Sequence, residues 1–190
     1  MKVLEALATR RAVREFRGDP VDRKVLTELI DAAVQAPSYM NLQPWSFAVI
    51  DDAAVIASFG EQAKQHLRET MGFKSPFSAS RAQVGDPSYH IFYGAPALIL
   101  INSTIEGVLA EFSCATAAYG LMLAAHSMGL GTCLVSQALP WLRSWEGRNA
   151  LHLAKDHYPV APIIVGCPLA ETLSPRRLPP SIHWIGDDRP

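Results

Sequence analysis

The sequence lacks most of the motifs that mark metal-dependent and nucleophilic enzymes. It has three cysteines, Cys114, Cys133 and Cys167, with no CxxC or CxxH spacing. This argues against a disulfide framework or a zinc site and predicts a reducing, cytoplasmic environment. There is no GxSxG or HExxH motif, the six histidines show no ligand spacing, and no carboxylate pair suggests acid–base work. We therefore expect no bound metal and no catalytic acid or base among the side chains.

Strong charge and targeting signals are also missing. The 17 basic and 18 acidic residues give a formal net charge of −1, so no overall field favours nucleic acid or an anionic membrane as a partner. The N-terminus has no apolar segment behind a basic one, so we expect no secretory signal. Repeats and linkers are absent, and 49% of the 190 residues are hydrophobic. This composition predicts a single domain over residues 1–190.

The apolar pattern predicts both helices and strands. Apolar residues at spacings of three and four predict a helix over residues 25–34. We also predict helices over residues 3–9, 53–70, 108–128 and 140–153, of which 108–128 is rich in Ala, Leu and Met and 140–153 has Pro140 in its first turn. Short apolar runs predict strands over residues 46–50, 96–102, 132–136 and 160–165. Residues 70–89 have no such pattern, and we expect an irregular lid or binding loop there, with Phe73 or Phe77 near a ligand.

The helix predicted over residues 108–128 is long and apolar enough to suggest a membrane span. Ser113, Thr116 and Tyr119 lie inside it, and no basic flank supports insertion. A helix that is apolar nearly all round is usually buried. In a chain of this size, we expect that burial to occur at a large subunit interface.

Residues 35–45, with the sequence QAPSYMNLQPW, carry many polar groups between a predicted helix and a predicted strand. Pro37 ends the helix, because proline lacks a donor and disfavours helical backbone in the residue before it. The loop then offers a hydroxyl, a phenol and two amides from Ser38, Tyr39, Asn41 and Gln43. These groups suit a flat heteroaromatic ligand, although a simple structured connection explains the loop equally well.

Basic residues are concentrated near the N-terminus, where 7 of the 17 lie within the first 24 positions. Arg10, Arg11 and Arg14 lie close together there, and a guanidinium group binds phosphate through a planar fork of donors. The cluster therefore indicates a phosphate-binding arm. A solvated charged surface paired with Glu15 and Asp19 is the alternative.

Taken together, RRAVREF at residues 10–16 and APSYMNLQPW at residues 36–45 resemble the signature of the FMN-dependent nitroreductase family. LAAHSMGLGT at residues 123–132 and VGCP at residues 165–168 extend the resemblance to nearly the whole chain. It implies an α+β fold with a central, mostly antiparallel sheet flanked by helices. It also implies an intertwined homodimer in which each flavin site is built from both chains.

The same resemblance implies which residues bind FMN. Arg10, Arg11 and Arg14 would contact the phosphate and ribityl chain, with Ala12 in place of the usual serine. The partner chain would supply residues 37–43, which we call the central loop. A basic residue after Ala170 would return to the phosphate. The remaining implied contacts are Pro37, Ser38, Tyr39, Asn41, Gln43, Leu134, Val135, Ser136, Arg176 and Arg177.

The implied reaction passes a hydride from NADH or NADPH through FMN to a small acceptor such as a nitroaromatic, a quinone or free flavin. Donor and acceptor would occupy the same place in turn, which predicts ping-pong kinetics. Oxidase or dehalogenase chemistry on the same scaffold is one alternative. A flavin-binding protein without turnover is another, because Ala12 replaces the usual serine and Gly120 stands where relatives often carry asparagine.

Overall fold

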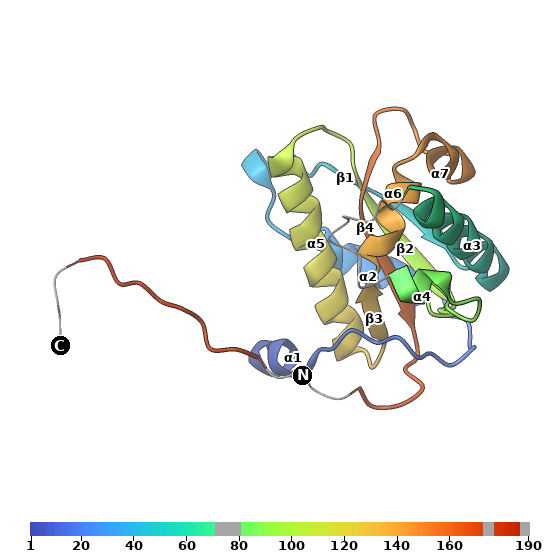
Figure 1. Cartoon of the computed structure of the whole chain (residues 1–190). Coiled ribbons are helices and arrows are strands. Elements are labelled where there is room, and N and C mark those ends of the chain that lie inside the picture. The colour runs from blue at the N-terminus through green and yellow to red at the C-terminus, as the bar shows by residue number, and fades with distance from the viewer. Residues whose placement is uncertain (71–80, 173–176, 187–190) are drawn as a thin grey trace.

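The computed structural model describes residues 1–70, 81–172 and 177–186. Figure 1 shows a central sheet with helices on both faces. The strands are β1 (Trp45–Ile50), β2 (Ala97–Ser103), β3 (Gly131–Leu134) and β4 (Tyr158–Gly166). The α-helices are α1 (Val3–Thr9), α2 (Arg23–Ala33), α3 (Ala53–Thr70), α4 (Arg81–Gly85), α5 (Val108–Ser127), α6 (Leu139–Leu142) and α7 (Trp145–Ala150). Among the described residues, 3₁₀ turns are found at η1 (Tyr39–Asn41) and η3 (Ser136–Ala138).

The sheet confirms the predicted antiparallel arrangement. Its strand order is β1-β2-β4-β3, and every neighbouring pair is antiparallel. All seven residues of β2 are buried, as the continuous apolar run at residues 96–102 predicted. The fold is therefore α+β, with β2 and β4 at the centre and β1 and β3 at the edges.

Two apolar layers enclose the sheet because successive strand residues point to opposite faces. Leu98 and Leu100 of β2 pack in the layer formed with α3 and α6. Ile99 and Ile101 pack in the layer formed with α2 and α5. Strand β2 is thus buried on both faces.

Helix α5 is only half enclosed by this layer. Cys114, Ala117 and Leu121 are fully buried on its inner side, whereas Leu109, Phe112 and Tyr119 are 41–62% exposed. Its length and hydropathy would also suit a membrane span, but 44% of that window is buried inside the chain. An apolar outer surface of α5 therefore remains uncovered in the single chain.

Two predicted elements need correction. The helix expected over residues 140–153 is wrong, since the chain forms α6 and then α7. Ser144 starts α7 as its N-cap, accepting a hydrogen bond from the backbone N–H of Gly147 at 3.2 Å. A Cβ on Gly147 would lie 2.1 Å from the Trp141 carbonyl oxygen, so the two short helices fold tightly together. In addition, the stretch expected to be irregular over residues 70–89 contains α4; its residues 71–80, with Phe73 and Phe77, lie outside the described residues.

Residues 10–17, which we call the arginine segment, run along the outer edge of β3. The backbone N–H of Val13 donates to the Thr132 carbonyl, and that of Arg17 donates to the Cys167 carbonyl, both at 2.9 Å. A Cβ on Gly131 would come within 2.8 Å of the Val13 side chain. Glycine at position 131 therefore allows the arginine segment to approach β3 closely.

Residues 177–186, which we call the tail, extend away from the body of the chain (Figure 1). Leu178, Ile182, Trp184 and Ile185 are 62–92% exposed along it. Within the described part of the chain, these four large apolar side chains are therefore left largely uncovered.

Candidate functional site

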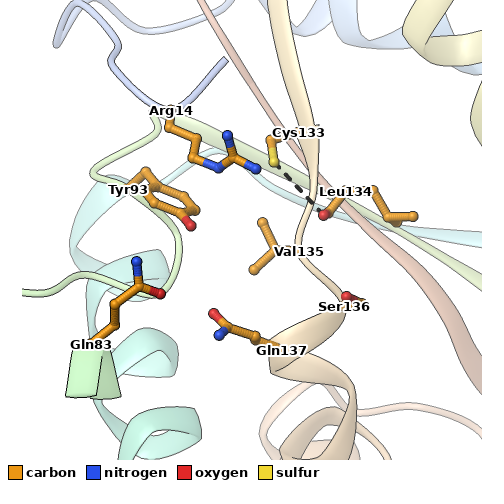
Figure 2. A pocket seen from close by; sticks show the side chains of 8 residues that line it. All are labelled: Arg14, Gln83, Tyr93, Cys133, Leu134, Val135, Ser136 and Gln137. Carbon is orange, nitrogen blue, oxygen red and sulfur yellow. Dashed lines mark hydrogen bonds between the residues drawn. The ribbon is translucent and has the colours of Figure 1, made fainter. Parts of the chain in front are cut away.

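A cavity of about 390 Å³ opens beside the end of β3, and we call it the β3 cavity. Figure 2 shows its two walls. One wall carries Arg14, Gln83 and Tyr93, and the other carries the continuous stretch from Cys133 to Gln137. The cavity therefore joins two of the predicted groups, namely Arg14 and residues 134–136.

Arg14 stands over an aromatic ring at this cavity. Its guanidinium carbon lies 5.8 Å from the centroid of the Tyr93 ring, within the range of a cation–π contact. A stacked guanidinium keeps its N–H donors, which lie in its own plane, for other partners. Arg14 can thus provide both positive charge and hydrogen bonds to a ligand here.

Cys133 is only 5% exposed although it lines the cavity. Burial raises the pKa of its thiol, and the positive charges of Arg14 and Arg10 offset this only in part. The thiol therefore stays protonated near neutral pH and does not act as a nucleophile. Its prediction as a packed thiol is confirmed.

The wall that carries Tyr93 is fastened to α3 by two basic side chains. Lys64, which is 2% exposed, donates to the carbonyl oxygens of Tyr89 at 2.8 Å and Pro87 at 3.3 Å. Arg68 donates to the Val84 carbonyl at 3.0 Å. This wall is held by backbone contacts that do not depend on its own side chains.

A second cavity, of about 350 Å³, lies beside α1 and is lined by Arg10, Arg11, Thr9, His126 and Thr132, among others; we call it the α1 cavity. The buried Nε of Arg10 has no hydrogen-bond partner among the described residues, and its guanidinium carbon lies 5.9 Å from the Tyr119 ring centroid. Two guanidinium groups in one cavity suit an anion such as phosphate.

His126 lies at the same cavity, with its Nε2 2.8 Å from the Thr9 hydroxyl. Burial lowers the pKa of His126, and the neighbouring charges of Arg10 and Arg11 lower it further. The imidazole is therefore neutral at physiological pH. It lines the anion site without adding to its charge.

The two cavities meet β3 from opposite sides. Thr132 lines the α1 cavity, and the next residue, Cys133, lines the β3 cavity, because successive strand residues point to opposite faces. The α1 cavity therefore offers cations, and the β3 cavity offers one guanidinium group among mixed polar and apolar groups.

The central loop lies elsewhere on the chain, at the opposite end of α5. The backbone N–H of Tyr39 donates to the Ser113 hydroxyl at 3.2 Å, whereas the arginines lie near His126. Thirteen residues of helix separate these points, or about 20 Å at 1.5 Å per residue. A single chain therefore does not bring Pro37, Ser38, Tyr39, Asn41 and Gln43 to either arginine cavity.

The loop itself is held in an unusual backbone conformation. Met40, Asn41 and Gln43 have φ angles of 48°, 56° and 48°, a region that side chains other than glycine and asparagine rarely adopt. The Ser38 hydroxyl accepts from the Gln43 backbone N–H at 3.0 Å and stabilises this bend. Tyr39, Asn41 and Gln43 are consequently exposed at the surface. Such strain is commonly found at binding loops.

The structure describes only one of the two predicted C-terminal arginines. Arg176 lies outside the described residues, and Arg177 is exposed and lines neither cavity. From the C-terminal region, Glu171 and Thr172 line the α1 cavity instead. Our sequence analysis missed Gln83, Tyr93, Gln137 and His126; only Gln137, next to the predicted residues 134–136, had a signal that could have indicated it.

Comparison with known proteins identifies the family of this chain. The sequence profile of the Nitroreductase family matches residues 7–167. The chain belongs to the nitroreductase family. It is 29% identical over 190 residues to a Methanothermobacter thermautotrophicus protein provisionally named NADH dehydrogenase/NAD(P)H nitroreductase, covering 96% of this chain and 86% of that protein.

Solved structures of the nitroreductase family share the fold. A Bacteroides fragilis nitroreductase with bound FMN superposes with a TM-score of 0.82 at 22% identity, over 98% of this chain and 100% of that one. Iodotyrosine deiodinase bound to FMN and 3-iodo-L-tyrosine superposes with a TM-score of 0.81 at 20% identity, over 97% and 100%. The fold is therefore that of the nitroreductases, and it is shared by proteins with different substrates.

Proposed function

We propose that the protein is an FMN-dependent oxidoreductase that transfers a hydride from NADH or NADPH to a small acceptor such as a nitroaromatic, a quinone or flavin. The observation that carries this proposal is the arginine segment beside β3, which brings Arg10 and Arg11 to the α1 cavity and Arg14 to the β3 cavity with residues 134–136. A nitroreductase of the same fold holds FMN. Three free cysteines fit a cytoplasmic location.

The described residues offer hydrogen-bond donors for both the phosphate and the ring of FMN. Arg10 and Arg11 would hold the phosphate, and the buried Arg10 Nε would gain a partner there. Arg14 and the backbone of Leu134, Val135 and Ser136 would hold the ring. Ala12 offers no hydroxyl, and its backbone forms a bridge with Thr132, which lines the α1 cavity.

When bound, FMN supplies the redox chemistry, because a flavin can accept and return a hydride. The protein residues bind, orient and shield it. The positive charge of Arg14 stabilises negative charge that develops near the ring. Cys133 and Tyr89 stay protonated because burial raises the pKa of each, so neither serves as a base near neutral pH. We propose no catalytic acid or base from the side chains.

We further propose that the working unit is a homodimer, with the central loop of one chain completing the cavities of its partner. The loop is exposed in the single chain, as are the outer surface of α5 and the apolar tail. Exposed apolar surface of this extent is typical of protein interfaces. The loop, α5 and tail all gain partners in such an assembly.

An absorbance spectrum of the purified protein, repeated anaerobically after adding NADH and NADPH separately, tests the proposal. We expect a flavin spectrum that is bleached by at least one nucleotide. A flavin spectrum unchanged by both would favour oxidase or dehalogenase chemistry, or a flavin-binding role without turnover. A colourless protein that does not bind added FMN would refute the proposed function.

A further inference from the structure

Gln137 joins the two walls of the β3 cavity. It belongs to η3, on the wall formed by β3, and its Oε1 accepts a hydrogen bond of 2.6 Å from the Tyr89 hydroxyl. Tyr89 precedes Tyr93 by one helical-type turn on the opposite wall, and their rings meet edge to face at 5.9 Å. One hydrogen bond therefore connects segments that lie 48 residues apart in the sequence.

This bond fixes which end of the Gln137 amide is available to a ligand. A phenol has a single proton to donate, and an amide has an oxygen acceptor and two N–H donors. With the oxygen engaged by Tyr89, the N–H donors are the end left for the cavity. Figure 2 shows the amide end of Gln137 pointing into the cavity, toward Gln83.

Tyr89 is itself held firmly. Its carbonyl oxygen accepts from the buried Lys64 ammonium at 2.8 Å, and its ring packs against that of Tyr93. The hydroxyl therefore has a defined position, and it restricts the rotation of Gln137. A donor whose orientation is fixed before binding loses less entropy on binding than a mobile one does.

The cavity consequently presents donors from two sides, with the Arg14 guanidinium on one wall and the Gln137 amide on the other. We propose that Gln137 is a specificity-determining contact that donates a hydrogen bond to the carbonyl or carboxamide edge of a planar ring in the β3 cavity, and that Tyr89 is its positioning residue. This inference rests on the proposed function. The ring belongs either to FMN or to the second substrate, such as a nicotinamide or a quinone, and the two sources share this chemistry.

Replacing Gln137 tests the contact. Gln137→Leu removes both hydrogen-bonding groups at similar size, and Gln137→Glu keeps an acceptor for Tyr89 but removes the donors. Apoprotein is titrated with FMN by fluorescence. Protein saturated with FMN is then assayed for kcat and KM with NADH and with a quinone. We expect Q137L to weaken either FMN affinity or KM by about tenfold, which corresponds to the loss of one hydrogen bond. Q137E should weaken the same quantity at least as much.

The measurement that changes shows which molecule carries the ring. A loss in FMN affinity assigns the contact to FMN, and a higher KM for NADH or quinone at unchanged FMN affinity assigns it to the second substrate. Gln62→Leu on the exposed side of α3 is the matched control and should change neither. If both Gln137 variants stay within twofold of wild type in FMN affinity and in KM, the inference is overturned.

The positioning role of Tyr89 is tested by a double-mutant cycle. We expect Tyr89→Phe to weaken the same quantity by about threefold and to add nothing in the Q137L background, because it acts through Gln137. Tyr158→Phe serves as its control. Equal losses for Y89F in both backgrounds would show a merely structural role. Failure of the proposed function itself is distinguishable, since wild-type protein would then neither bind FMN nor react with NAD(P)H.

Discussion

The arginine segment and the tail are both irregular, yet they differ in how they are held. Backbone hydrogen bonds to Thr132, Cys167 and Leu169 fix the arginine segment against the body. The tail carries larger apolar side chains but leaves them exposed. Backbone hydrogen bonds therefore hold the arginine segment within one chain, although its apolar content is the smaller. In the homodimer that we propose, the partner chain would cover the tail.

The largest effect is expected from removing the tail. Truncation before Arg177 should weaken self-association at least a thousandfold, because four large apolar side chains contribute about 1.5–3 kcal/mol each when buried. Sedimentation of truncated and full-length protein over a range of concentrations measures this. A full-length protein that is already monomeric would contradict our comparison of the two segments.

The next largest effect is expected from the arginine segment. Replacing Arg10 and Arg14 together with alanine should weaken FMN binding by at least a hundredfold, since hydrogen bonds to charged groups contribute about 1.5–3 kcal/mol each. Flavin content after purification and a fluorescence titration provide the measurement. Arg17→Ala, which lines neither cavity, is the control. Full retention of flavin by the double variant would refute the phosphate and ring assignments.

A smaller effect is expected from forcing the arginine segment away from β3. Gly131→Ala would place a methyl group 2.8 Å from Val13, so the free energy of unfolding should fall by about 1–3 kcal/mol and FMN binding should weaken. Chemical denaturation measures the first quantity. Gly18→Ala has no neighbour within 4 Å and should leave both quantities unchanged. Normal FMN binding in G131A would show that the close approach to β3 is unnecessary.

The smallest effect concerns the pH dependence of stability. The pKa of His126 is lowered in the folded chain, so its stabilising contribution is present above the unfolded pKa near 6.5 and is lost as the pH falls through the folded value. The apoprotein should therefore lose more thermal stability than His126→Gln between pH 7.5 and 5, by about 1 °C. Parallel melting curves of the two proteins that never diverge would contradict this assignment.

Much of the framework could be predicted from local pattern. The apolar run of β2, the apolar spacing of α2 and the nearly continuous apolar character of α5 all follow from burial, so they are visible in the sequence. The division of residues 140–153 into two helices was missed because it depends on the Ser144 cap and the close contact at Gly147. A pattern of apolar spacing does not register such a contact.

The candidate site was predictable only in part. The arginines and residues 134–136 stand in contiguous motifs, and the structure brings Arg14 and residues 134–136 to one cavity and Arg10 and Arg11 to another. Gln83 and Tyr93 reach the same cavity through tertiary packing, which no short motif encodes. The central loop was identified from its polar groups, but its distance from the arginines in one chain could be seen only in three dimensions.

Lys64 and Arg68 attach the wall that carries Tyr93 to α3. Both side chains bond to main-chain carbonyls on the far side of residues 71–80, so the wall is anchored independently of that intervening sequence. Helix α3 thus holds the wall that carries Tyr93 directly, and exchanging the sequence between Thr70 and Arg81 would leave these hydrogen bonds in place.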